Sequence, residues 1–243
     1  MSKLSSFIDE TSWPTSASKS KDQTKAVLLR TVLPYLKARF SSPPPIDPKS
    51  LPSVTPAILT SWTQATSVLV LALPTESLFP LVDMWRLAFL DPAVGSWLAA
   101  LNPTNPPTDP ISMFLSKNIN ALDSPHKGSR NYVLTVVRML CNAFSHTALS
   151  HQLLASNLMR EKITAEALVP SLLHSDGIVR TAAASLAFNV STVLQKSRVE
   201  RVKNGREIKS YATDSGFADW EVEIVSAVIE ALDREKENEE VGE

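Results

Sequence analysis

The chain has 243 residues, with 24 Lys and Arg side chains against 25 Asp and Glu, 17 prolines, six glycines and one cysteine. A single cysteine excludes a disulfide framework or a cysteine-rich zinc module, and a net charge of -1 excludes a globally basic nucleic-acid binder. Phosphate loops, dinucleotide folds and nucleophile elbows need glycines where φ is positive or where backbones approach closely. So few glycines among 44% apolar residues indicate packed helices joined by proline-containing turns.

The sequence carries no recognisable targeting signal. Its first ten residues, MSKLSSFIDE, do not combine a basic region with a following apolar region, as a secretory signal would. The longest nearly polar-free run covers residues 68–73, far short of the roughly 20 residues that a membrane span requires. We therefore expect no membrane association, and a cytoplasmic or nuclear location or both.

The N-terminal part of the chain divides into a leader, a helix and a proline-rich connection. Residues 1–21 are rich in Ser, Thr and Lys and are expected to form a mobile leader that docks through Phe7, Ile8 and Trp13. A helical pattern begins at Asp22, and Pro34 should kink that helix. Residues 41–55 contain consecutive X–Pro bonds, which favour an extended connection.

Several later helices are predicted from a capping residue followed by proline, since proline is favoured at the first helical position. Thr55 should open a helix that runs to about residue 72, Asp91 a short helix, and Asp109 a helix through ISMFLSKNINAL. Thr75 is expected to cap the helix that contains FPLVDMWRLAF, and Ser129 to start the helix that contains YVLTVVRMLCNAF.

The C-terminal half continues this pattern. Short helices are expected at 147–159 and 162–174, separated at Arg160, and a turn at 175–177 should precede a helix over 178–194. A basic loop over 196–216 should lead to a last helix that starts at Asp219. No segment alternates apolar and polar residues long enough to predict a strand, and the apolar run at 68–73 lies within a capped helical window.

This series of helices predicts an all-α fold, an armadillo-like helical solenoid of about five to six irregular repeats. The strings LVDMWRLAFLD, VVRMLCNAFS and AAASLAFNVS form a weak internal repeat at intervals of roughly 50 residues. Each is an apolar helix that carries a polar residue near the same point. In an armadillo unit the third helix lines the concave groove, where such a residue would meet a partner peptide.

The segments TESLFPLVDMWRLAFLDPAV, NYVLTVVRMLCNAFSHT and IVRTAAASLAFNVSTVLQK, in this order, resemble the PUL domain. This domain is the C-terminal module of phospholipase-A2-activating protein and its yeast ubiquitin-fusion-degradation relatives. The resemblance covers approximately residues 13–241, and it is most specific in the FPxxDxxRLA and RxxxNxF strings. It implies an armadillo-like domain over 22–243 that lacks the last helical unit of the family.

The resemblance also implies a function. It implies an adaptor without catalysis, which binds the acidic C-terminal tail of the ubiquitin-selective AAA ATPase valosin-containing protein. Matching the family strings to this sequence gives Arg86, Arg138, Asn142 and Asn189 as the residues that bind the partner. Arg86 is the first candidate, because basic residues on the concave ridge bind the tail in the family.

The chemistry of these residues suits an acidic peptide. Guanidinium groups bind carboxylates in charge-assisted pairs, and an asparagine amide both donates to and accepts from an extended backbone. Arg138 and Asn142 stand four residues apart and so share one helix face, while Met84 and Trp85 could frame an apolar subsite.

Purely structural roles remain open for the same residues. Arg86 could pair with Asp83 or Glu76, and Arg138 either pairs internally or faces a groove. Asn142 and Asn189 could hydrogen-bond neighbouring helix ends, because a buried polar group left unpaired costs about 1–3 kcal/mol.

Catalytic and metal sites are not indicated. Cys141 lies on an apolar stripe, where an inert thiol is expected, and the four histidines lack the spacing of a helical metal site. We expect no cofactor, no metal, no small-molecule substrate and no enzymatic activity.

Two charge runs carry the alternative hypothesis. Between Lys196 and Lys209 six basic residues stand against two acidic ones, and from Glu230 to Glu243 seven acidic residues stand against two basic ones. A basic run is ordinarily a solvated segment. The alternative function is an α-helical scaffold that binds another protein, its own fused domain or nucleic acid, with residues 196–209 as the contact; we expect no nucleic-acid binding from the protein as a whole.

Overall fold

The computed structural model describes residues 2–11, 18–40, 54–101, 109–203 and 215–241. Within these ranges the chain is helical and contains no strand, which confirms the predicted all-α helical solenoid. The elements are α1 (Ser2–Glu10), α2 (Ser18–Ala26), the π-helical turn η2 (Val27–Val32), α3 (Leu33–Arg39), α4 (Pro56–Ala72), the 3₁₀ turn η4 (Thr75–Ser77), α5 (Phe79–Ala88), α6 (Pro92–Ala99), α7 (Pro110–Leu122), α8 (Lys127–Ala143), α9 (Thr147–Ala155), α10 (Asn157–Ile163), the π-helical turn η5 (Thr164–Leu168), α11 (Val169–Leu172), α12 (Gly177–Lys203) and α14 (Ser215–Val241).

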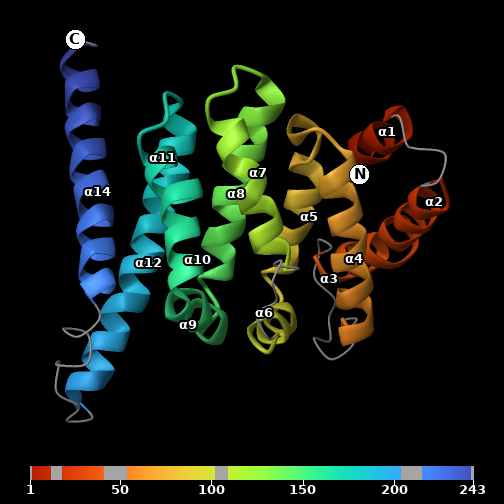
Figure 1. Ribbon diagram of the computed structural model, residues 1–243, viewed down its shortest axis with the longest axis horizontal. Helices are drawn as coiled ribbons and strands as arrows, with labels where there is room; N and C mark the ends of the chain where they lie inside the picture. Colours follow the sequence, from red (N-terminus) through yellow and green to blue (C-terminus); the bar gives the residue numbers. More distant parts are fainter. Residues whose placement is uncertain (1, 12–17, 41–53, 102–108, 204–214, 242–243) are drawn as a thin grey trace.

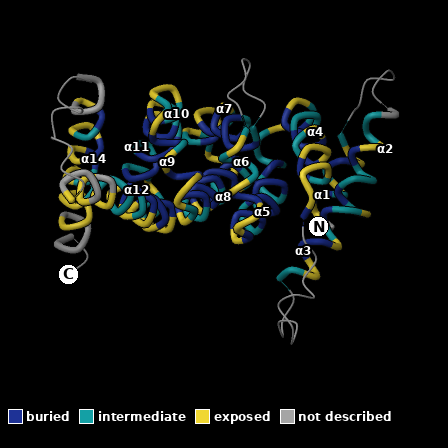
Figure 2. Tube along the Cα trace, turned by 90° about the horizontal axis from the view of Figure 1, so that it is seen from below, coloured by how far each residue is buried: buried dark blue, intermediate teal, exposed yellow. Residues whose placement is uncertain are grey.

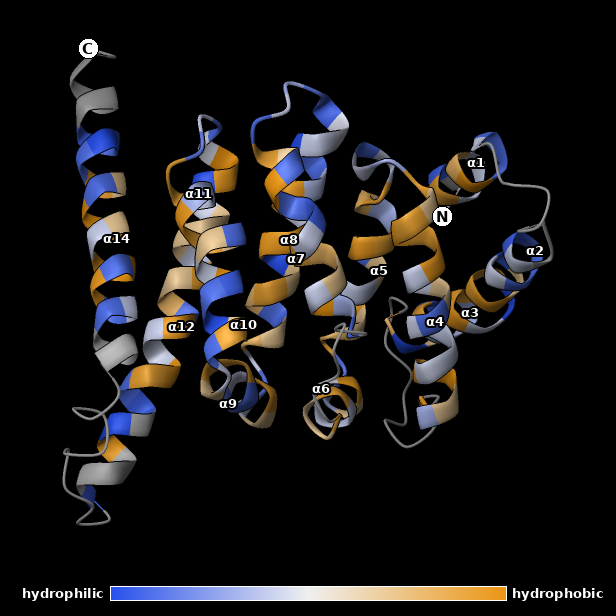
Figure 3. Cartoon of the chain, viewed as in Figure 1, coloured by the Kyte–Doolittle hydropathy of each residue, from blue (hydrophilic) through white to orange (hydrophobic). Residues whose placement is uncertain are grey.

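The helices stack in chain order, with α1 and α14 at opposite ends (Figure 1). Helices α5, α8 and α12 form one layer, and α4, α7 and α10 form the other (Figure 2). Helix α8 is central: it packs against α5 and α12 within its own layer and against α7 in the other. Hydrophobic residues gather along the helix faces that meet inside the stack (Figure 3).

The centre of the core is aromatic. Trp62 of α4 stacks on Trp85 of α5, with ring centroids 4.1 Å apart, and neither side chain is exposed. The Trp85 indole donates to Thr66 Oγ1 at 2.9 Å, and the Tyr132 hydroxyl of α8 donates to the Phe114 carbonyl of α7 at 2.7 Å. The large rings therefore join the two layers, and the polar atoms of Trp85 and Tyr132 remain hydrogen-bonded within the core. Trp85 is thus a core residue and not part of a surface subsite.

Three of the predicted caps are confirmed. Thr55 Oγ1 accepts from the Ile58 amide at 3.3 Å, Asp91 Oδ1 from the Ala93 amide at 3.0 Å, and Asp109 Oδ1 from the Ser112 amide at 2.8 Å. Each is followed by proline at the start of the helix. These helices begin where local chemistry satisfies the unpaired N-terminal amides.

Three other predicted boundaries are wrong. Thr75 begins η4 and does not cap α5, which starts at Phe79 without a side-chain cap. Helix α8 begins at Lys127, and its cap is His126, whose Nδ1 accepts from the Gly128 amide at 3.0 Å. The break predicted at Arg160 lies at Ser156, whose Oγ accepts from the Met159 amide at 3.3 Å.

Residues 2–10 differ from the expected mobile leader. They form the amphipathic helix α1, in which Leu4 and Ile8 are buried. The Phe7 ring packs edge-on against Phe79 of α5, with centroids 6.3 Å apart, and Asp9 pairs with Lys25 of α2 at 2.6 Å. Leu4 and Ile8 stand four residues apart and so pack together against the stack, although most of their neighbours in sequence are polar. The predicted docking residue Trp13 lies outside the described residues.

The predicted helix at Asp22 starts earlier, at Ser18, and Pro34 does not end it. Proline lacks an amide hydrogen, so a continuous α-helix would lose a hydrogen bond at this point. The π-helical turn η2 stands immediately before it, and the Leu33 amide donates to the Leu28 carbonyl, five residues back. The predicted kink thus takes the form of a local widening of the helix.

The predicted basic loop at 196–216 is also wrong in its first part. Helix α12 continues to Lys203, and Arg198 pairs with Glu221 of α14, while residues 204–214 lie outside the described part. Within α12, the stretch Gly177–Lys196 is long and apolar enough to cross a bilayer by length and composition alone, a criterion that core helices of water-soluble proteins also meet.

Asp91 connects the N-terminal helices to the rest of the stack. This buried carboxylate caps α6, accepts from the Tyr35 hydroxyl at 2.8 Å and pairs with Arg39 Nε at 3.0 Å. We expect Asp91→Ala to lower the free energy of unfolding by about 3 kcal/mol, because it leaves Tyr35 and Arg39 without their acceptor. Asp109→Ala, which removes a cap alone, should cost about 1 kcal/mol. Urea denaturation of both variants measures the difference, and equal losses would contradict the role of Asp91.

Asp176 makes the stability dependent on pH. The hydrogen bond from Arg130, at 2.5 Å, lowers the pKa of Asp176 from 3.8 to about 2, and Asp176 Oδ1 also accepts from the Ile178 amide at the start of α12. A pKa lowered in the folded state gives stability that is present above the unfolded pKa and lost as pH falls through the folded one. Asp176→Asn should therefore flatten the fall in stability between about pH 4 and pH 2, measured by thermal unfolding across that range. An unchanged pH profile would contradict the assignment.

Candidate functional site

A groove lies across the exposed surface of α5, α8 and α12. It encloses about 370 Å³. Its lining consists of Arg86 from α5, Arg138, Cys141 and Asn142 from α8, and Ile178, Thr181, Ala182 and Ser185 from α12. Three of the four residues predicted to bind a partner, Arg86, Arg138 and Asn142, therefore meet in one groove, although they lie on two helices far apart in sequence.

Arg138 is the most accessible of these residues. It is exposed, whereas Val137 and Met139 on either side of it are fully buried in the core. Within the described ranges no carboxylate lies within ion-pair distance of its guanidinium group. Of the two roles left open by the sequence, the structure therefore has Arg138 facing a groove.

Arg86 is held by a carboxylate on its own helix. Its Nε donates to Asp83 Oδ1 at 2.7 Å, and the side chains of Arg86 and Asp83 are 29% and 47% exposed. This is one of the two intrahelical pairings that the sequence left open. A solvent-exposed pair of this kind contributes at most about 1 kcal/mol, so the carboxylate of a ligand can compete for the same guanidinium group.

Asn142 joins α8 to the end of α5. In the last turn of α5 the Phe89 amide donates to the Trp85 carbonyl, but the next amide, of Leu90, donates to Leu87. In a continuing α-helix the Leu90 amide would donate to the Arg86 carbonyl, so the tightened turn leaves this carbonyl without that bond. Asn142 Nδ2 donates to it at 2.8 Å.

Asn189 repeats this arrangement one helix further along. At the end of α8 the Phe144 amide donates to the Leu140 carbonyl and the Ser145 amide to Asn142, which passes over the Cys141 carbonyl. Asn189 Nδ2 of α12 donates to that carbonyl at 3.2 Å. The two asparagines therefore bond neighbouring helix ends, the structural role that the sequence left open. Asn142 also lines the groove, but Asn189 is not among the lining residues.

A second, larger hollow adjoins the groove at Arg138. It encloses about 710 Å³, and Arg138 belongs to both. Its floor is apolar, with Phe40, Phe79 and Met84 among the lining residues. Met84, which the sequence suggested as part of an apolar subsite, is therefore at such a site, next to the Asp83–Arg86 pair.

Lys3 and Lys37 also line this larger hollow, and the sequence prediction missed both. Lys3 was assigned to the expected mobile leader, although the amphipathic spacing of Leu4 and Ile8 indicates a helix that would have placed it. Together the groove and the hollow contain four cationic side chains, Lys3, Lys37, Arg86 and Arg138, and one carboxylate, Asp83. We refer to the two together as the basic groove. Its charge favours an anionic ligand.

Cys141 lies in the groove as an inert group. Burial raises the pKa of its thiol to about 11, and its Sγ lies 3.7 Å from the Ala182 carbonyl. Such a thiol stays protonated and is a poor nucleophile. In the described part of the chain no cluster of His, Cys, Asp and Glu could hold a metal ion.

A stacked all-α fold with an open basic groove defines a helical solenoid of the protein-interaction class. The model of one family, the PUL domain, matches residues 1–242, and the chain belongs to this family. The PUL domain is a protein–protein interaction module. The match includes the N-terminal residues that form α1. No curated protein and no solved structure matched the chain.

The bond between Asn142 and the end of α5 can be tested by stability. Asn142→Ala leaves the Arg86 carbonyl without its donor and should lower the free energy of unfolding by about 1–2 kcal/mol. Asn120→Ala, on the exposed side of α7, is the matched control and should change it by less than about 0.5 kcal/mol. Urea unfolding of the two variants gives the comparison. Equal stabilities would show that the bond contributes nothing to the register of the two helices.

Proposed function

We propose that the chain is a non-catalytic adaptor whose basic groove binds the acidic C-terminal tail of a valosin-containing-protein-type AAA ATPase. In this role it supports ubiquitin-dependent protein turnover in the cytoplasm, the nucleus or both. The observation that carries the proposal is the meeting of Arg86, Arg138 and Asn142 in one groove with two further lysines and a single carboxylate.

The arrangement suits an acidic peptide in three ways. Arg138 has no ion pair among the described residues and offers its guanidinium group to a carboxylate without first losing a partner. Arg86 can exchange its exposed Asp83 partner for a ligand carboxylate. Asn142 uses one amide hydrogen within the stack, and its amide has a second hydrogen and an acceptor oxygen for a peptide backbone.

The alternative function is a scaffold that binds another protein or its own fused domain through the basic residues of 196–209. One observation weighs against it: Arg198 of this segment already pairs with Glu221 of α14. A basic side chain engaged within the chain is less available to an acidic partner. The basic groove is therefore the better supported contact.

The proposal predicts that Arg138→Ala weakens binding of an acidic tail peptide by about tenfold, since a charge-assisted pair contributes about 1.5 kcal/mol or more. Arg86→Ala should weaken peptide binding less, because in the unsubstituted chain Arg86 must give up its pair with Asp83 before it can bind the peptide. Isothermal titration of the full chain with the peptide measures both. Affinity should also fall as salt is raised, because exposed charges are screened.

Arg30→Ala is the matched control, because Arg30 is exposed on η2 and does not line the basic groove. It should leave the affinity unchanged. Replacing the basic residues of 196–209 by serine separates the two functions: tail binding persists under the proposal, whereas the alternative expects the loss of binding to its own, different partner. The proposal fails if no binding is detected at millimolar peptide, or if neither arginine variant changes the affinity.

A further inference from the structure

One carboxylate stands among the cationic side chains of the basic groove. Asp83 of α5 lines the larger hollow, and its Oδ1 accepts from Arg86 Nε at 2.7 Å. The other charged residues that line the groove and the hollow are the cations Lys3, Lys37 and Arg138. A carboxylate repels an anionic ligand, because like charges placed together across an interface are unfavourable. Asp83 therefore opposes the binding that the rest of the groove favours.

The Asp83 side chain does not hold the helices together. It is 47% exposed, and its bonded partner among the described residues is Arg86, three residues later on the same helix. An exposed pair one turn apart contributes little to stability. Asp91, by contrast, is buried and bonds both Tyr35 and Arg39 of α3. The pair of Asp83 and Arg86 thus acts at the surface of the groove and not in the core.

The pair also makes the two guanidinium groups of the groove unequal. Arg138 has no carboxylate within ion-pair distance among the described residues, whereas Arg86 Nε is bonded to Asp83. Carboxylates bind arginine most strongly in charge-assisted pairs of this geometry. A ligand carboxylate that binds Arg86 through Nε must therefore displace Asp83 first. The free chain offers Arg138 to a ligand and keeps Arg86 occupied.

We infer that Asp83 competes with the ligand for Arg86 and so limits the affinity of the basic groove for strongly acidic peptides. The inference rests on the proposed binding of an acidic peptide in this groove. A peptide with few carboxylates binds Arg138 and the two lysines and leaves the Asp83–Arg86 pair intact. A peptide with a longer acidic run also reaches Arg86, but the gain is reduced because the pair is broken and Asp83 remains nearby.

A positioning role for Asp83 predicts the opposite effect. If the pair held Arg86 in the conformation that binds the ligand, removal of the carboxylate would weaken binding, because a freely rotating side chain loses more entropy when it is immobilised. If Asp83 competes with the ligand, its removal releases the Arg86 guanidinium group and strengthens binding. The direction of the change in affinity separates the two roles.

The test titrates the full chain with two synthetic peptides with blocked termini, one with four consecutive aspartates and one with two. Asp83→Asn should bind the four-aspartate peptide about three- to fivefold more tightly than the unsubstituted chain does, and the two-aspartate peptide less than about twofold more tightly. Asp83→Ala should give the same gain, because it also removes the carboxylate. In the Arg86→Ala background the gain from Asp83→Asn should fall below about twofold, since no guanidinium group is released.

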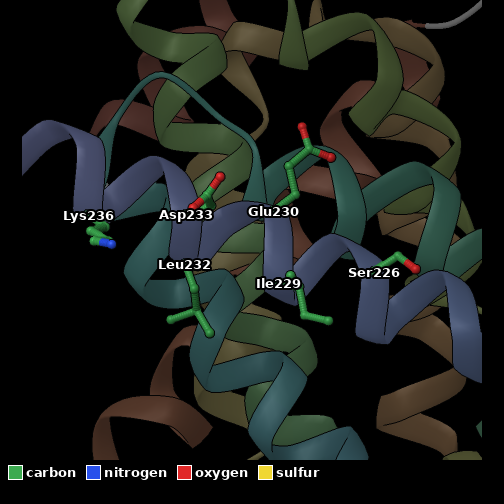
Figure 4. Close-up of a pocket in the computed structure, with 6 residues that line it drawn as sticks. All are labelled: Ser226, Ile229, Glu230, Leu232, Asp233 and Lys236. Atoms are coloured by element: carbon green, nitrogen blue, oxygen red, sulfur yellow. The ribbon is translucent and has the colours of Figure 1, made fainter.

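Asp233→Asn is the matched control. It removes one negative charge, as Asp83→Asn does, but Asp233 lies on α14 beside a separate hollow (Figure 4). It should leave both affinities unchanged. Circular dichroism checks that each variant is folded, which is expected because the altered side chains are exposed or half-buried at the surface.

The inference is overturned if Asp83→Asn weakens binding of the four-aspartate peptide or leaves it unchanged, or if the gain persists in the Arg86→Ala background. The proposed function survives these results as long as Arg138→Ala still weakens binding. If neither peptide binds the unsubstituted chain or Asp83→Asn, the proposed function and this inference fall together.

Discussion

The register of the stack depends on carbonyl groups that two helix ends leave unbonded. When α5 and α8 finish in a tightened turn, the carbonyls of Arg86 and Cys141 lose the amides that would bond them in a continuing helix. The next helix supplies the donor each time, Asn142 to the first and Asn189 to the second. Because a side-chain amide reaches only one carbonyl, each bond fixes how far one helix is displaced along its neighbour.

This register determines what the outer surface can present. With Asn142 bonded to the end of α5, Arg138 comes one turn before it and stands beside Arg86 across the gap between the two helices. The opposite face of α8 is buried, so its exposed face can vary without disturbing the core. The same polar residue therefore has a structural bond and a place in the groove, and these two roles need not compete.

Local chemistry allowed much of the fold to be predicted. Thr55, Asp91 and Asp109 open helices because their oxygens accept from amides two or three residues away, which a sequence shows directly. The boundary predicted at Arg160 was wrong because Arg160 lies inside α10, where it is buried and its guanidinium lies over the Trp220 ring, with Cζ 5.7 Å from the centroid. The break itself is set by the local cap of Ser156, which the sequence prediction missed. In the site, the four-residue spacing of Arg138 and Asn142 allowed the prediction that both lie on the same face of one helix. Lys3 and Lys37 could not be assigned, because only the folded chain brings α1 and α3 to α8.

The central claim is that an acidic peptide binds where Arg86 and Arg138 meet. Nuclear magnetic resonance of the arginine side-chain Nε–H groups reports on each guanidinium separately during a titration with the tail peptide. The account predicts that the signals of Arg86 and Arg138 shift together and saturate at one peptide concentration, while the signal of Arg30 stays in place. Shifts confined to Arg198 and the other arginines of 196–209, with Arg86 and Arg138 unchanged, would contradict it.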